Sequence, residues 1–216
     1  KEDLIDSQTA LVLADENLLF PVLNNLPDSI QSVNITMGAP FSSTPLFSLV
    51  DLLFKTQLNK QQYGKNKFHS KDIQKLLRNP YLSRLIKSSK LMAINDHLNK
   101  KNIVFVSTSS LKKVVNDDSQ WDILAFILGD WSDTTLAIHN IKLLLDKLKN
   151  QLVKQEASVE SEILFSFYKS IQILENHLLD FKGDMDLKTL RAIFFQIIGK
   201  ESIAFMGEPL NGLQMM

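Results

Sequence analysis

The stretch TALVLADENLLF, Thr9–Phe20, decides the fold prediction, because an apolar run passes through acidic residues into a helical pattern. Such a run predicts a buried strand that leads into a helix. A second apolar run, SIAFMGEPLNGLQMM at Ser202–Met216, enters a Gly/Pro loop, and we expect it to stop there without a partner strand. The two stretches look like separated parts of one domain, and the chain starts at Lys1 without an initiator methionine. We therefore expect a piece cut from a larger protein, with an insertion between the two parts.

Between these ends the pattern is mostly helical. Val33, Ile35 and Met37 alternate with polar residues and predict a strand, which Gly38-Ala39-Pro40 should break. Ser43 or Thr44 can cap a helix that starts at Pro45 and runs to about Asn59, and residues 61–69 are predicted as a polar loop. Short helices should follow over residues 70–79, 81–88, 91–98, 110–115 and 121–128, with a strand or extended connector at 102–107.

The second half is more regular. Apolar residues at helical spacing predict long amphipathic helices over 134–155 and 158–181, and Asp186 can cap a third helix that Gly199 ends. Three such helices joined by short links indicate a bundle. The predicted fold class is α/β, mainly α, in which short parallel strands are interrupted by an inserted helical subdomain.

Composition limits the function classes. The chain has 216 residues, is 44% apolar and 22% charged, and has no cysteine, which excludes disulfides and thiolate metal sites. No apolar run reaches the ~18 residues that cross a bilayer, and the N-terminus lacks a signal-peptide pattern, so we expect a cytoplasmic protein. The four histidines, at 69, 97, 139 and 177, are scattered and favour no metal site. We expect no cofactor and no catalytic residue, since no nucleophile, base and metal set converges.

Charge is unevenly distributed although the net charge is zero. Between Lys55 and Lys90 there are ten Lys or Arg residues and a single acid, Asp72. Such a concentration can attract the phosphates of nucleic acids, and a solvated helical face is the plain alternative. Tyr63, Phe68 and Tyr81 are interleaved with the basic residues, as in surfaces where bases stack on rings, although core packing explains Phe68 and Tyr81 equally well.

The N-terminal order of strand, helix, strand, Gly38-x-x-Phe41 and apolar helix resembles the second RecA-like motor domain of superfamily I helicases related to UvrD and RecB. That family inserts a helical subdomain and returns with a strand and a motif ending Lys-Gly-Leu-Glu. Here Ile203–Met206 and then Asn211–Gln214 stand in those places. The resemblance implies a motor segment at residues 1–60, an inserted helical subdomain at 61–199 and a return segment at 200–216.

The departures from the family matter as much. The family's motif IV arginine has no counterpart, because Ala14-Asp15-Glu16 stands there, and the family's later His and Lys align with Glu208 and Asn211. Acids in the place of the motif IV arginine would repel a triphosphate, so the resemblance implies a motor that does not hydrolyse ATP. Inactivated motors of this kind are found in AddB-like subunits of bacterial helicase–nuclease complexes. The sequence Glu208–Gln214 is most similar to the corresponding sequence in subunits of Bacteroides-type bacteria. In that family a PD-(D/E)XK nuclease domain follows, and the complex processes double-strand breaks for recombination.

The resemblance thus implies a non-catalytic part of a DNA-repair protein that scaffolds and contacts single-stranded or duplex-end DNA through phosphates, beside a partner helicase–nuclease subunit. The candidate DNA-binding residues are Lys65, Lys67, Lys71, Lys75 and Arg78. An alternative is a protein-interaction module without DNA binding, in which the apolar stripes at Ile141–Leu152 or Val159–Leu178 dock a partner. A small α/β enzyme is the third hypothesis. Exposed stripes would favour docking, whereas mutual burial of the helices removes that argument.

Overall fold

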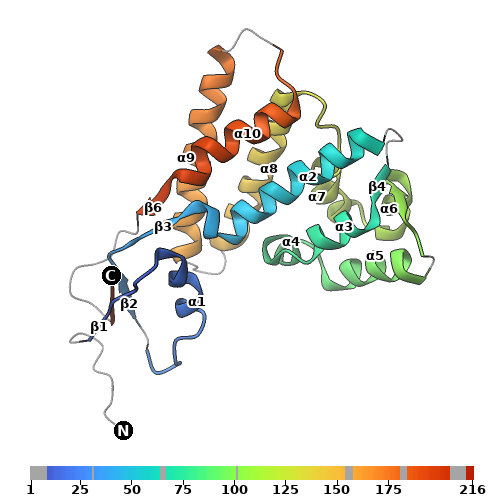
Figure 1. Cartoon of the computed structure of the whole chain (residues 1–216). Helices are drawn as coiled ribbons and strands as arrows, with labels where there is room; N and C mark the ends of the chain where they lie inside the picture. The colour runs from blue at the N-terminus through green and yellow to red at the C-terminus, as the bar shows by residue number, and fades with distance from the viewer. Residues whose placement is uncertain are drawn as a thin grey trace.

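The computed structural model describes residues 9–30, 32–63, 67–100, 102–153, 158–180, 184–204 and 213–216. Within them the protein is mainly helical, with a small parallel sheet and two short antiparallel ribbons. The predicted fold class is therefore confirmed. Figure 1 shows the small sheet and the C-terminus at one side, and the helices extending away from it. Among the described helices, none combines the length and apolar character needed to span a membrane.

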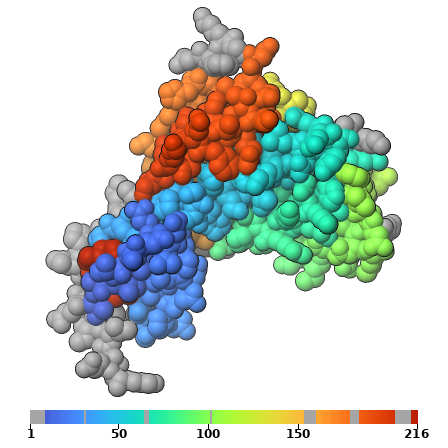
Figure 2. Space-filling view, viewed as in Figure 1, coloured from blue at the N-terminus to red at the C-terminus, as the bar shows by residue number. Residues whose placement is uncertain are grey.

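The small sheet joins the two ends of the chain. Its strands are β1 (Ala10–Leu11), β7 (Leu213–Met215) and β2 (Val33–Ile35), and β7 lies in the middle, parallel to both neighbours. Figure 2 shows the atoms of β7 surrounded by those of the N-terminal segment. The expectation that the C-terminal stretch has no partner strand is wrong, because alternate residues Leu213 and Met215 are buried in this sheet. The two ends of the chain nevertheless meet in one sheet, as expected for parts of one domain.

A second pairing connects this sheet to the helices. β3 (Gly38–Pro40) runs antiparallel to β6 (Ser202–Ala204), and the amide of Phe41 donates to the carbonyl of Glu201. The prediction that Gly38-Ala39-Pro40 only breaks the preceding strand is wrong, since the segment turns and pairs with a different strand. Gly38 fits there because a Cβ at this position would lie 2.3 Å from the Ser202 Oγ. The return strand at Ile203 was correctly predicted, but its partner was not.

Helix α2 (Pro45–Tyr63) is the central element of the helical body. It begins as the sequence predicts, with the hydroxyl of Thr44 accepting from the amide of Phe47 and Pro45 in the first turn. Its buried face includes Leu49 and Phe54, and it packs on α10 (Leu187–Ile197) through stacked rings of Phe47 and Phe194 whose centroids are 5.3 Å apart. The helix extends four residues beyond the predicted end at Asn59, and it runs from the sheet side to the far end of the body (Figure 1).

At that far end lies the ribbon of β4 (Lys67–His69) and β5 (Phe105–Ser107), which pair antiparallel. The predicted polar loop over residues 61–69 is wrong, because its start belongs to α2 and its end is a strand. Helices pack around this ribbon and α2 close to where the sequence predicts them: α3 (Ser70–Leu77), α4 (Pro80–Leu85), α5 (Ser88–Lys100), α6 (Thr108–Val115) and α7 (Asp118–Ile127).

The long helices α8 (Thr134–Val153) and α9 (Ser158–Asp180) lie side by side and, with α10, form the predicted bundle. Asp186 caps α10 as expected, accepting from the amide of Thr189. The remaining elements are α1 (Leu19–Leu23) and three 3₁₀ turns at Glu16–Leu18, Phe41–Ser43 and Ile198–Lys200.

Two separate groups of buried apolar residues support these parts. One large core runs through the helical body and includes α2, although the sequence assigns most of α2 to the motor segment at residues 1–60. A small core beneath the parallel sheet is made of Leu19, Ile35, Ala39 and Met215. The domain boundaries at 60 and 199 stay a prediction.

Candidate nucleic-acid interface

The basic segment between Lys55 and Lys90 divides into cations that have partners and cations that have none. Lys55 pairs with Asp51 at 2.6 Å, Arg84 with Glu160 at 2.5 Å, and Lys87 with Asp117 at 3.3 Å. Lys60 donates to the carbonyl of Gly129 at 3.1 Å and lies over the Phe68 ring. These four cations hold neighbouring elements together, and their charge is already partly balanced.

The other group coincides with the residues predicted to bind DNA. Lys67, Lys71, Lys75 and Arg78 are all exposed, and none of them has an ion pair within the described part of the chain. Lys65 lies outside the described residues. Lys90, the last cation of the segment, is half-buried. Four adjacent cations are therefore free to meet an anion from solution.

Three of these cations form one row on α3. Lys71, Lys75 and Arg78 follow at spacings of four and three residues, which places them on one face of the helix. Like charges at these spacings destabilise a helix by roughly 0.2–0.5 kcal/mol per pair. Asp72, in the first turn of the same helix, is half-buried and accepts from the side-chain amide of Asn59 at 2.9 Å. Among the described residues, Lys71, Lys75 and Arg78 form no ion pair with an acid.

Only one of the three predicted aromatic residues lies at the surface. Phe68 is fully buried and Tyr81 is 3% exposed, so the prediction that they could stack on bases is wrong, and they belong to the core. Burial also raises the pKa of Tyr81 to about 12, with the Glu160 carboxylate adding to the rise. Tyr63 is 41% exposed at the end of α2.

Two further surface rings were missed by sequence reasoning. Phe105 lies 5.2 Å from Tyr63, between ring centroids, and His69 lies 5.4 Å from Phe105. Lys67, which pairs with Ser107, shares the outward face of the β4–β5 ribbon with His69 and Phe105. The alternation of exposed and buried residues in Lys67–His69 was the available signal, but it becomes visible only once the pairing partner is known.

Near this interface, Lys60 has a different electrostatic role. Burial lowers the pKa of its ammonium, and the nearby Asp130 carboxylate partly offsets that effect. The amide of Gln57 also donates to the carbonyl of Ile127 at 2.9 Å, so two side chains of α2 hold the segment after α7. Lys60 therefore stabilises the packing of α2 against the segment after α7, and we do not include it in the candidate interface.

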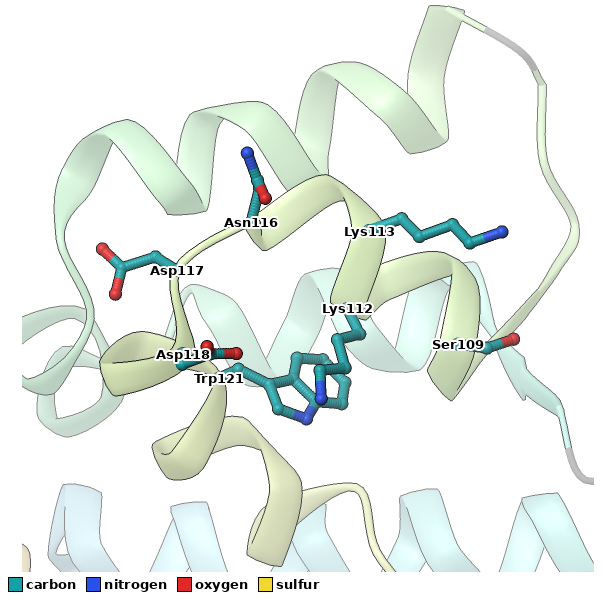
Figure 3. Close-up of a pocket in the computed structure, with 7 residues that line it drawn as sticks. All are labelled: Ser109, Lys112, Lys113, Asn116, Asp117, Asp118 and Trp121. Carbon is teal, nitrogen blue, oxygen red and sulfur yellow. The ribbon is translucent and has the colours of Figure 1, made fainter.

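A surface hollow of about 430 Å³ lies between α6 and the start of α7, and Figure 3 shows its lining residues. One of its acids, Asp117, already has a structural role. Asp117 caps α7, accepting from the amide of Gln120 and the hydroxyl of Ser119, and these contacts lower the pKa of its carboxyl to about 2. In Figure 3 Lys113 and Asp117 extend in opposite directions, so they do not converge on a reacting atom.

The described residues show no convergent catalytic or metal-binding set. No group of three or more His, Asp or Glu side chains within them could hold a metal ion. Asp15, which the family resemblance places at the nucleotide, accepts from the amide of Asn17 at 2.9 Å and caps a short turn. Glu208 and Asn211, the other two altered positions, lie outside the described residues.

The two apolar stripes proposed for partner docking are interior. Ile141, Leu144 and Leu148 of α8 face Ile163 and Phe167 of α9, and all are at most 2% exposed. These helices bury their stripes in the core that they share, so the argument for docking through the stripes is wrong. Phe165 of α9, which lies outside both stripes, is 72% exposed.

Comparisons with known proteins add no identification: no protein-family model, curated protein or solved structure matches the chain. The resemblance to AddB-like inactivated helicases therefore stays a prediction from the residue pattern. The interface described above depends only on the geometry and charge of this chain.

Proposed function

We propose that this chain makes sequence-independent, non-catalytic contact with DNA through Lys67 and the α3 row of Lys71, Lys75 and Arg78. One observation carries the proposal: these four exposed cations have no acidic partner among the residues that the structure describes, whereas Lys55, Lys60, Arg84 and Lys87 of the same segment are held by partners. Phosphate contacts of this kind fix position without reading sequence.

The geometry of the row fits a phosphate backbone. From Lys71 to Arg78 a helix advances about 10 Å, at a rise of about 1.5 Å per residue. Along the axis of a duplex, the phosphates of one strand advance by about 3.4 Å each, so a row parallel to that axis spans roughly three such intervals. Flexible lysine and arginine side chains can adjust to the remaining mismatch.

A salt titration tests the proposal. With four phosphate contacts, the logarithm of the association constant should fall with the logarithm of salt with a slope of about −3 for single strands and about −4 for duplex. Between 50 and 200 mM salt, the single-strand affinity should fall by roughly 50-fold. Absence of binding at about 50 mM salt, where phosphate contacts are strongest, would sink the proposal.

A matched pair of variants separates this row from general electrostatics. The triple variant Lys71→Ala, Lys75→Ala, Arg78→Ala removes three charges from one face. The control triple Lys147→Ala, Lys149→Ala, Lys188→Ala removes the same charge from exposed lysines on α8 and α10. We expect the first to weaken DNA binding and flatten the salt slope by about 2, since each lost contact removes about 0.7–0.9. Equal losses in both triples would contradict a defined interface.

We also propose the kind of larger protein in which this DNA contact is made. The chain would be the inserted helical subdomain, with flanking strands, of an AddB-like inactivated helicase that acts in the processing of double-strand DNA ends. Its support is the residue resemblance together with β7, which joins the N-terminal strands in one parallel sheet although the helical body lies between them in the sequence. The parent protein's sequence tests this proposal: a nucleotide-binding region upstream and a carboxylate nuclease motif downstream are expected, and unrelated flanking domains would contradict it.

A further inference from the structure

The outward face of the β4–β5 ribbon carries an aromatic cluster, which we define as Tyr63, His69 and Phe105. In the ribbon, Phe68 and Val106 point inward and are at most 2% exposed, whereas His69 and Phe105 are cross-strand partners on the other face. Tyr63 reaches this face from the end of α2, and its ring meets Phe105 edge-on. Three rings from three elements are therefore gathered on one side of the ribbon.

Core packing does not account for this cluster. Phe105 is 42% and Tyr63 41% exposed, so much of each ring is in contact with water. Single exposed apolar residues are common, but a contiguous group rimmed by polar residues marks a binding site.

The cluster is continuous with the cationic row. Lys67 lies on the same face of β4 as His69, and the backbone amide of Lys71 donates to the Nδ1 of His69 at 3.2 Å. The row thus begins at the edge of the cluster and continues along α3 through Lys75 and Arg78. Exposed rings flanked by unpaired cations are complementary to a strand that carries both bases and phosphates.

We propose that the aromatic cluster stacks unpaired bases, so that the chain binds single-stranded DNA in preference to duplex. In a duplex the bases are already stacked on one another, and their faces are closed to side chains. In a single strand the base faces are free, and stacking on aromatic side chains is insensitive to base identity. The phosphates of the same strand would then follow the α3 row. This inference rests on the proposed function, since the row must hold the backbone for a base to reach the rings.

The test compares binding of a fluorescent oligothymidylate and of a duplex of equal phosphate number to the whole chain at constant salt. Phe105→Ala and Tyr63→Ala should each weaken single-strand binding by about tenfold and leave duplex binding within about twofold, because stacking is worth roughly 1–3 kcal/mol per base. Phe105→Leu keeps the apolar bulk without the ring, and it should lose nearly as much. Phe165→Ala, which removes an even more exposed ring from α9, is the control and should change neither.

A second readout reports the contact directly and does not depend on affinity. An oligonucleotide carrying 5-iodouracil, a base that cross-links to stacked aromatic side chains on irradiation, should attach to Tyr63 or Phe105. Mass spectrometry of the digested complex locates the attachment. Attachment to Phe165 or to scattered residues instead would overturn the inference.

The outcomes separate the inference from the proposed function. If the α3 triple variant weakens binding of both DNA forms while the ring variants change neither, the phosphate contact stands and base stacking is overturned. If neither DNA form binds, both proposals fall. RNA offers comparable base faces and the same phosphates, so oligouridylate of equal length is included. Equal or tighter binding of DNA supports the assignment, and clearly tighter binding of RNA overturns it.

Discussion

Arg191 of α10 holds Asp51 of α2 through two hydrogen bonds to one carboxylate oxygen, from Nε at 3.0 Å and from Nη2 at 2.7 Å. The other carboxylate oxygen forms an ion pair with the Lys55 ammonium, and the Arg191 guanidinium also lies over the Phe195 ring at 4.6 Å. The two residues are 140 positions apart in the sequence. This contact joins the last helix of the body to the central one.

Arg191→Ala should lower the free energy of unfolding by about 1–3 kcal/mol, because it removes two charge-assisted hydrogen bonds and leaves a largely buried carboxylate with one partner. Arg191→Lys should recover only part of this loss, since an ammonium cannot reproduce the planar arrangement of Nε and Nη2. Urea unfolding measures both changes. Arg78→Ala, at an exposed arginine without an ion pair among the described residues, is the control and should stay within about 0.5 kcal/mol.

The two faces of the β4–β5 ribbon should respond differently to truncation. Phe68→Ala empties a fully buried site and should cost about 3–5 kcal/mol of stability, as large-to-small core changes do. Phe105→Ala, on the outward face, should cost less than about 1 kcal/mol. Thermal unfolding of both variants checks the difference. Similar large losses would mean that Phe105 also supports the core.

Reversing one charge of the α3 row should separate DNA affinity from stability. Lys71→Glu removes a like-charge neighbour from Lys75 and places an acid in the first turn of α3, which the helix dipole and the Glu–Lys pair at i,i+4 favour by a few tenths of a kcal/mol. DNA affinity should nevertheless fall, because one phosphate contact becomes a repulsion. Urea unfolding and fluorescence anisotropy on the same preparation provide the two numbers. A loss of both would indicate a damaged fold.

Asp117 should contribute to the acid sensitivity of folding. Its pKa is lowered to about 2 in the folded chain, first by the Ser119 hydroxyl and then by the Gln120 amide, from an ordinary value of 3.8. A lowered folded pKa means that the contribution is complete above pH 3.8 and is lost as pH falls through 2. Asp117→Asn keeps a capping oxygen without the titrating charge, so its stability should fall less between pH 5 and pH 2 than that of the parent chain. Unfolding curves at the two pH values measure this difference, and an unchanged pH dependence would contradict the assignment.

Local signals were sufficient where an element carries its own boundaries. Asp186 caps α10 and Pro45 opens α2 because their preferences depend on the first turn alone. The stripes of α8 and α9 are long enough to show the helical period, and helical period indicates burial. Whether the buried stripes form an internal core or a docking face can be decided only from the arrangement of the helices in space.

The segments that the sequence predicted wrongly share one cause. β3, β4 and β7 are strands of three residues, too short to show a period, and their partners lie far along the chain. The candidate interface was also only partly predictable from the sequence. Exposure of Lys71, Lys75 and Arg78 follows from their helical spacing, whereas the outward direction of Phe105 follows only from its register with His69.

The central position of β7 also determines the order in which the fold can be completed. Asn34 in β2 donates to Gln214 in β7 across 180 residues, so the sheet cannot close until nearly the whole described chain has been made. Closing so long a loop is entropically costly when the chain between is unfolded. The helical body, which is richer in local contacts, should therefore form first and bring the two ends together. The helical body then serves as the template on which the parallel sheet assembles.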